Sequence, residues 1–121
     1  MYYKAIAKYQ DEFYSIASLI GITIKSTIIP IYKYTNALCI APNENGLYAF
    51  YNKKDVIKWI KYIKSKPLSA FGNYLELNVE YYMLELNIKD EDIITTGKKN
   101  ELQIPYIKCK KMEEIKREKI I

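Results

Sequence analysis

The sequence predicts an α+β fold: one domain built on a mostly antiparallel sheet of about five strands, with one main amphipathic helix and one or two short helices. Three observations lead to this prediction. Short segments rich in β-branched and aromatic residues alternate with turn formers along the chain, which is typical of antiparallel strands. One central segment has apolar residues at helical spacing. The length of 121 residues, without an internal repeat or a low-complexity linker, indicates that residues 1–121 form a single domain.

The first third of the chain contains two expected strands and one ambiguous segment. Residues 3–9, YKAIAKY, predict an opening strand. Residues 11–21, DEFYSIASLIG, alternate well enough for a strand, but they also have apolar residues at helical spacing and Asp11 suits an N-cap, so we favour a short helix. These apolar residues are Phe13, Ile16, Ala17 and Ile20. Residues 22–34, ITIKSTIIPIYKY, predict a strand that lies at a sheet edge or is broken at Pro30, because proline cannot donate to the ladder.

The best-defined unit lies in the middle of the chain. Residues 42–46, PNENG, predict a turn, and residues 47–51, LYAFY, predict a short strand. A helix is expected over residues 53–64, with Asn52 as its N-cap and Asp55 near the positive end of the helix dipole. Its apolar face consists of Val56, Ile57, Ile60 and Ile63. This face is expected to pack on the sheet.

A second strong strand is expected over residues 73–86, NYLELNVEYYMLEL. The alternating apolar residues are Leu75, Leu77, Val79, Tyr81 and Met83. The alternation then changes phase, so that Leu84 and Leu86 fall on the polar side. Because a one-residue slip reverses the face of every following side chain, we expect a bulge or a strand end near residue 83.

The last third of the chain is expected to end in a strand and a helix. Residues 87–101 predict a loop with a short extended piece near Ile93. Residues 102–109, LQIPYIKC, predict a final strand, which Pro105 places at a sheet edge. Residues 112–121, MEEIKREKII, are highly charged and predict a short terminal helix that frays.

The residue types exclude several common chemistries. The chain has no histidine, which removes Ser-His-Asp and Cys-His pairs, His-ligated zinc and the usual proton shuttle near neutral pH. It contains neither GxGxxG nor GxxxxGK[ST], the common phosphate-binding loops. Cys39 and Cys109 lack CxxC spacing and are expected to be buried free thiols in a reducing compartment. We therefore expect no metal, no cofactor and no catalytic residue; a His-free enzyme that uses Tyr, Glu and Lys is the least favoured alternative.

Two acidic groups come nearest to a catalytic or metal site. Glu76 and Glu80 share a strand face, but an extended strand separates them by ~13 Å, which is too far for a glycosidase pair. Residues 89–93, KDEDI, lack the DxDxDG rhythm of a calcium-binding loop. Both groups are interpreted as solvated carboxylates.

The charge of the chain is mildly basic, with 19 basic and 14 acidic residues and a formal net charge of +5. Arg117 is the single arginine, although arginine is the better ligand for phosphates. The excess of lysine and isoleucine fits AT-rich coding better than selection for nucleic-acid binding. No apolar run approaches the ~18 residues of a membrane span, and residues 1–10 lack the apolar core of a signal peptide. We expect no membrane contact and a cytoplasmic location.

The candidate binding residues are Lys54, Lys58, Lys61, Tyr62 and Tyr82. The three lysines form a stripe at helical spacing, on the side of the helix opposite its apolar face. Tyr62 accompanies the stripe, whereas Trp59 lies near the apolar face and is expected to be mostly buried in the core. Tyr82 belongs to a tyrosine cluster that suggests a Tyr-lined sheet face. Aromatic residues beside lysines can bind single-stranded nucleic acid, and this function is a second alternative.

Three segments resemble small accessory proteins of bacterial and archaeal viruses and mobile elements: YYKAIA (2–7), NENGLYAFYNKKDVIKWI (43–60) and YLELNVEYY (74–82). The resemblance carries no catalytic motif. It implies a protein that works in the cytoplasm of the host cell by binding a host or viral macromolecule, with protein favoured over nucleic acid. The two proline-bearing strands also predict open sheet edges, from which we expect a homodimer.

Overall fold

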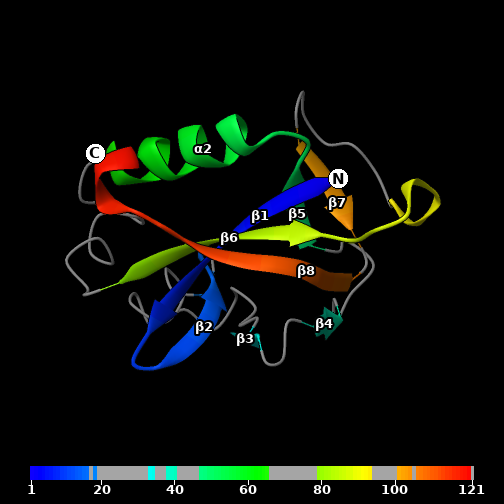
Figure 1. The fold of residues 1–121 in the computed structure, drawn as a ribbon, viewed down its shortest axis with the longest axis horizontal. Coiled ribbons are helices and arrows are strands. Elements are labelled where there is room, and N and C mark those ends of the chain that lie inside the picture. The colour runs from blue at the N-terminus through cyan, green and yellow to red at the C-terminus, as the bar shows by residue number, and fades with distance from the viewer. Residues whose placement is uncertain are drawn as a thin grey trace.

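The computed structural model describes residues 1–16, 18, 33–34, 38–40, 47–65, 79–93, 101–104 and 106–120. Within these residues, eight antiparallel strands and one long helix form the α+β fold that the sequence predicts (Figure 1). The strands are β1 (Tyr2–Tyr9), β2 (Glu12–Ser15), β3 (Lys33–Tyr34), β4 (Leu38–Ile40), β5 (Leu47–Phe50), β6 (Glu80–Leu86), β7 (Glu101–Ile104) and β8 (Tyr106–Ile115). The helices are α2 (Lys53–Ser65) and the 3-10 turns η2 (Asp90–Asp92) and η3 (Arg117–Lys119). The strands outnumber the five expected because short pieces such as β3 and β4 also pair.

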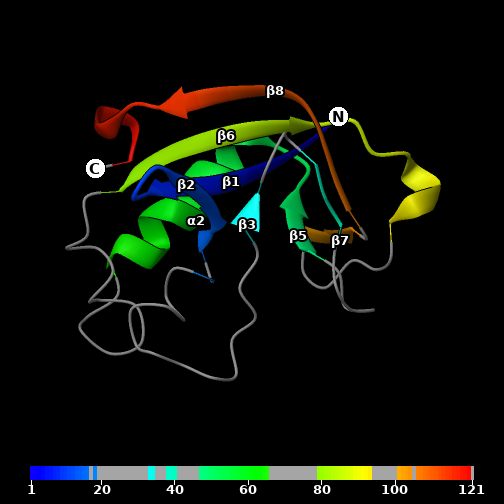
Figure 2. The ribbon, with the colours of Figure 1, turned by 90° about the horizontal axis from the view of Figure 1, so that it is seen from below.

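Strand β1 lies at the centre of the sheet. It pairs along most of its length with β6; on its other side it pairs with β2 near its C-terminal end and with β5 near its N-terminal end. Strand β6 pairs in turn with β8, whose first residues pair with β4, while β5 pairs with β7. The main path through the sheet is β3-β2-β1-β6-β8-β4. Helix α2 lies across one face of the central strands (Figure 2).

Both faces of the central sheet are buried. The first cluster joins the sheet to α2 and includes Ala5, Ala7, Val56, Ile60, Tyr81, Met83, Ile115 and Ile120. The second cluster lies on the opposite face and includes Ile6, Leu47, Leu84, Leu86, Leu102, Ile104 and Ile107. Successive side chains of a strand point to opposite faces, so β1 and β6 contribute to both clusters. This two-sided burial explains why β6 does not alternate cleanly between apolar and polar residues.

The phase change predicted near residue 83 is therefore not a register slip. Strand β6 runs on to Leu86, and the irregularity lies between Glu85 and Leu86. Glu85 is opposite Lys111 and Leu86 is opposite Cys109, so the extra residue is Lys110, on the partner strand β8. A bulge is present, but further along the strand than expected and on its neighbour.

The preference for a short helix from residue 11 is wrong over its first part. Glu12 to Ser15 form strand β2, and among the described residues helical geometry begins at Ile16 and includes Ser18. Gln10 and Asp11 make the two-residue turn of the β1–β2 hairpin, with φ angles of 51° and 63°. Asp11 is thus a turn residue rather than an N-cap. Pairing with β1 overrides the local helical spacing, because it supplies these residues with backbone partners and a sheet to pack on.

The terminal helix predicted over residues 112–121 is also wrong. Strand β8 continues through Ile115, and helical geometry is limited to the short turn Arg117–Lys119. Lys, Met and Glu favour helix locally, but pairing with β6 overrides that preference. Ile115 and Ile120 are only 6% and 3% exposed and belong to the first cluster, so this end of the chain packs against the domain instead of fraying.

The single edge strand expected over residues 102–109 is instead two strands: β7 pairs with β5, and β8 pairs with both β4 and β6. Three other expected elements are confirmed. The strands expected at 3–9 and 47–51 are β1 and β5, and the helix expected at 53–64 is α2. The described part of the chain has no helix with the length and apolar character that a membrane span requires. Several expected features lie outside the described residues: Pro30 with most of 22–34, the turn at 42–46, residues 73–78 and Pro105.

Candidate functional site

Helix α2 presents the predicted lysine stripe to solvent. Asn52 precedes the helix: its carbonyl accepts a hydrogen bond from the Asp55 backbone N–H at 3.2 Å, and its side-chain amide donates to the Asp55 carboxylate at 3.3 Å. Val56 and Ile60 are 0% and 1% exposed and hold the inner face on the sheet. The opposite side consists of Lys54, Lys58, Lys61 and Tyr62, all exposed; we call it the α2 outer face. The structure therefore brings together four of the five predicted binding residues.

The α2 outer face is positively charged. In the part of the chain that the structure describes, none of its three lysines forms an ion pair with a carboxylate. Asp55 is the single acidic residue of the helix, and Asn52 already donates a hydrogen bond to it. Unpaired lysines on one helix face create a local positive potential, which attracts acidic surfaces.

The aromatic residues near this helix have different environments. Tyr62 is 56% exposed, whereas Trp59 is partly buried against the first cluster, with its ring centroid 6.0 Å from that of Phe50. Trp59 is thus mainly a packing residue, as expected, although it is less buried than predicted.

Tyr82 does not join the α2 outer face. It packs against the second cluster, on the other side of the sheet, and its ring lies edge-on to Phe13 at a centroid distance of 5.3 Å. Its hydroxyl donates to Glu80 at 3.0 Å; burial, together with this hydrogen bond, raises the pKa of Tyr82. The tyrosines of β1 and β6 are divided between the two faces, with Tyr2 and Tyr81 buried in different clusters, so they do not line one open sheet face.

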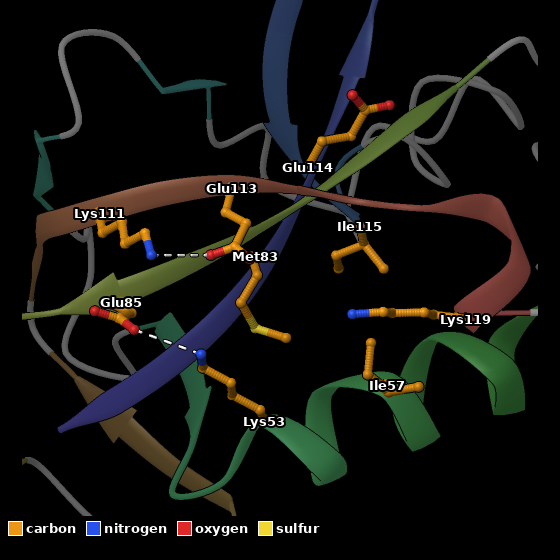
Figure 3. A pocket seen from close by; sticks show the side chains of 9 residues that line it. All are labelled: Lys53, Ile57, Met83, Glu85, Lys111, Glu113, Glu114, Ile115 and Lys119. Carbon is orange, nitrogen blue, oxygen red and sulfur yellow. Dashed lines mark ion pairs between the residues drawn. The ribbon is translucent and has the colours of Figure 1, made fainter.

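A groove that the sequence did not reveal runs between α2 and β8 (Figure 3). It has a volume of about 140 Å³, and we call it the α2–β8 groove. It is lined by Lys53, Ile57, Met83, Glu85, Lys111, Glu113, Glu114, Ile115 and Lys119. Helix α2, strands β6 and β8, and η3 each contribute residues, so the groove depends on contacts between distant parts of the chain.

Two ion pairs cross or flank this groove. Lys53 of α2 lies 3.6 Å from Glu85 of β6, and Lys111 lies 3.3 Å from Glu113 on β8. The hydrogen bond from Lys111 is the main cause that lowers the pKa of Glu113. The third lining lysine, Lys119, forms no ion pair with the described residues, and its ammonium points into the groove (Figure 3).

The expected helix over residues 112–121 hides this groove from sequence reasoning. In a helix, Lys111, Glu113 and Ile115 would point in different directions. In strand β8 they share one face and stand beside β6 and α2. The i, i+2 spacing of these residues is the pattern that indicates a shared strand face. The strong helix formers around them indicate a helix instead, and sequence reasoning followed the helix formers.

The titratable groups outside the groove include a short acidic segment and Tyr2. Among the described residues, no group of three or more His, Cys, Asp or Glu side chains could hold a metal ion. In the segment 89–93, Lys89 lies 4.0 Å from Glu91, and Asp90 accepts a hydrogen bond from the Tyr2 hydroxyl. That hydrogen bond and burial raise the pKa of Tyr2 to about 12. A phenol with a raised pKa is a poor base near neutral pH.

Cys109 is half-buried, and not buried as expected from the sequence. Its Sγ donates to the Lys111 carbonyl at 3.1 Å, and it has no disulfide partner among the described residues. Burial raises the pKa of the Cys109 thiol, which lowers its reactivity. The side chain of Cys39 and residue Glu76 lie outside the described residues.

Comparison of this chain with protein families, with curated proteins and with solved structures gives no match. The functional argument therefore depends on the residues themselves: a basic helix face with an exposed tyrosine, and a small groove on another side of the same helix.

Proposed function

We propose that this chain is a small accessory protein of a virus or mobile element, which works in the host-cell cytoplasm by binding a macromolecular partner. The partner is a host or viral protein with an acidic surface, and the α2 outer face contacts it. The observation that carries this proposal is the exposure of Lys54, Lys58 and Lys61 on one helix face without carboxylate partners among the described residues. The viral assignment is supported by the resemblance of segments 2–7, 43–60 and 74–82.

A folded helix suits this role because it holds its charges in a fixed arrangement. Lys54 and Lys61 are separated by a rise of about 10 Å along the axis, so an acidic patch of similar length can meet all three lysines. Such charges accelerate association and orient the partner. Tyr62 adds an exposed aromatic ring of a kind that often dominates interface energies.

Nucleic acid is the second candidate, and the same three lysines favour it. A protein partner ranks first because this face has no arginine, the residue best suited to phosphates and base edges. Salt dependence separates the two candidates. If all three lysines neutralise phosphates on duplex DNA, a log–log plot of affinity against salt has a slope of about −3.

We also propose that the chain forms a homodimer through an open sheet edge. Strands β3, β4 and β7 each pair with only one neighbour among the described strands, which supports the proposal. Light scattering during size-exclusion chromatography tests it, since a mass of 14.3 kDa at micromolar concentrations contradicts the dimer.

The function is tested by affinity capture from lysate of the cells in which the chain is naturally produced. The face variant replaces Lys54, Lys58 and Lys61 with glutamine. The control variant replaces three exposed lysines of the C-terminal region, Lys108, Lys110 and Lys116. Each variant removes three charges from +5 and leaves +2, so any difference reports position rather than net charge.

We expect the unmodified chain and the control variant to capture the same protein and the face variant to lose it. Equal capture by all three chains contradicts a role for the α2 outer face. Nuclease treatment of the lysate decides between the candidates: capture that disappears with the nucleic acid favours the second one.

A further inference from the structure

We infer that the α2–β8 groove binds a small organic acid, in which one carboxylate is joined to a short branched or cyclic apolar group. Three features of the groove support this: its size, its apolar lining, and one lysine, Lys119, that forms no ion pair with the described residues. This site is separate from the α2 outer face, because its lysines are Lys53, Lys111 and Lys119.

The apolar part of the ligand is set by the lining of the groove. Ile57 from α2, Met83 from β6 and Ile115 from β8 come together beside one another in Figure 3. Met83 and Ile115 belong to the first cluster and Ile57 packs against it, so this lining is part of a fixed core. The volume of about 140 Å³ is close to that of an apolar cavity that holds one benzene molecule, ~150 Å³. It therefore suits a small apolar group and is too small for a nucleotide or a drug-sized ligand.

The anionic part of the ligand follows from the charges that face the groove. Glu114 points away from it in Figure 3, which leaves Lys53, Lys111 and Lys119 against Glu85 and Glu113. Three positive and two negative charges give 3 − 2 = +1. Each glutamate forms its ion pair with another lysine, so Lys119, which acts on Glu113 only at longer range, supplies the excess charge. Its ammonium points toward the apolar residues (Figure 3). A carboxylate beside this ammonium completes the charge balance, whereas an amine increases the imbalance.

The test is a titration of the isotopically labelled full chain with isovalerate, followed by amide chemical shifts in NMR spectra. Isovaleramide and isopentylamine are the matched probes, since they keep the branched group and remove or reverse the charge. We expect saturable shifts at the groove residues of β6, β8 and η3 with isovalerate, and weaker or no binding of the other two. Isovaleramide that binds as tightly as isovalerate overturns the inference, as does the absence of saturable shifts in the groove.

Variants of Lys119 test the source of the selectivity. We expect Lys119→Met to weaken isovalerate binding by about 1.4- to fivefold, the range for an exposed ion pair, and Lys119→Arg to retain it. Lys116→Met is the matched control, because Lys116 is exposed nearby in sequence but does not line the groove. An equal loss in both methionine variants contradicts the assignment. Unchanged spectra of the unliganded variants show that the fold is intact.

A final probe separates a free acid from the end of a polypeptide. An N-acetylated peptide that ends in leucine presents the same carboxylate and branched group. We expect the peptide to bind no better than isovalerate, because the groove volume of about 140 Å³ suits one small apolar group and not a longer chain. Binding more than about tenfold tighter assigns the groove to a peptide terminus and overturns the small-acid inference. None of these results depends on the α2 outer face, so the inference and the proposed function fail independently.

Discussion

The hairpin between β1 and β2 contains two residues that its backbone geometry does not favour. Gln10 and Asp11 form the turn with φ angles of 51° and 63°, in the left-handed region. Two-residue hairpin turns of this geometry prefer Asn-Gly, because asparagine tolerates positive φ and glycine has no Cβ to clash. Replacing both residues, as Gln10→Asn with Asp11→Gly, should therefore stabilise the protein.

The size of the gain follows from the backbone cost. The left-handed conformation costs an ordinary L-residue ~1–2 kcal/mol of conformational free energy, and it costs aspartate less because aspartate tolerates this region. The new glycine lowers the free energy of unfolding by ~0.5–1 kcal/mol, because it increases the conformational entropy of the unfolded chain. The net gain is about 1 kcal/mol, most of it from position 10. Unfolding entropy is ~2.1 cal/mol/K per residue, so for 121 residues this gain raises Tm by about 4 °C.

Thermal unfolding followed by circular dichroism measures this change. Asp11→Val is the matched opposite variant, because a β-branched residue is disfavoured at positive φ; we expect it to lower Tm by about 4–8 °C. The reasoning is refuted if the Asn-Gly variant is less stable than the parent, or if Asp11→Val leaves Tm unchanged. Either result means that residues 10 and 11 do not form this turn in solution.

Two further predictions concern packing and acid sensitivity. Ile60 lies on the inner face of α2 and is almost completely buried, so Ile60→Ala should lower the free energy of unfolding by about 2–5 kcal/mol in urea denaturation. The exposed control Lys58→Ala should change it by less than about 0.5 kcal/mol, and similar effects of the two variants contradict the packing of α2 on the sheet. The pKa of Glu12 is below its ordinary 4.5, mainly because Lys33 and, secondly, Tyr14 donate hydrogen bonds to its carboxylate. Ionised Glu12 therefore stabilises the folded state above pH 4.5, and this stabilisation is lost as the pH falls through the lowered pKa of the folded protein. Glu12→Gln should therefore make Tm less dependent on pH below about 5. The effect should be small, because the Lys33–Glu12 ion pair is exposed. A pH profile of Tm that the substitution leaves unchanged shows that this ion pair does not form in solution.

Sequence reasoning succeeded where local preference and tertiary packing agree. The structure shows the apolar face and the lysine stripe of helix α2, and Asn52 directly precedes the helix, where its side-chain amide donates to the Asp55 carboxylate. Strands β1 and β5 were likewise predicted from β-branched and aromatic residues between turn formers. The fold class followed from these elements.

Sequence reasoning failed where pairing with a strand distant in sequence determines the secondary structure of a segment. Residues 112–115 of β8 favour helix on their own, and the pairing with β6 makes them a strand. The same pairing builds the α2–β8 groove, so the groove could not be predicted once the continuation of β8 beyond Cys109 was missed. Burial on both faces of β6 similarly removed the alternation from which its boundaries and bulge were inferred. Tyr82 was assigned to a binding face because nothing local shows to which side of a sheet a strand tyrosine points.

The central claim is that the α2 outer face binds an acidic protein partner. The most direct test is the affinity of the captured partner for three purified chains, measured by calorimetry at fixed salt: the unmodified chain, the variant with Lys54, Lys58 and Lys61 replaced by glutamine, and the variant with Lys108, Lys110 and Lys116 replaced. Three exposed ion pairs at 0.2–1 kcal/mol each predict a loss of roughly 3- to 150-fold for the first variant. The second variant should bind within about twofold of the unmodified chain. Equal weakening by both variants, or none by the first, contradicts the claim.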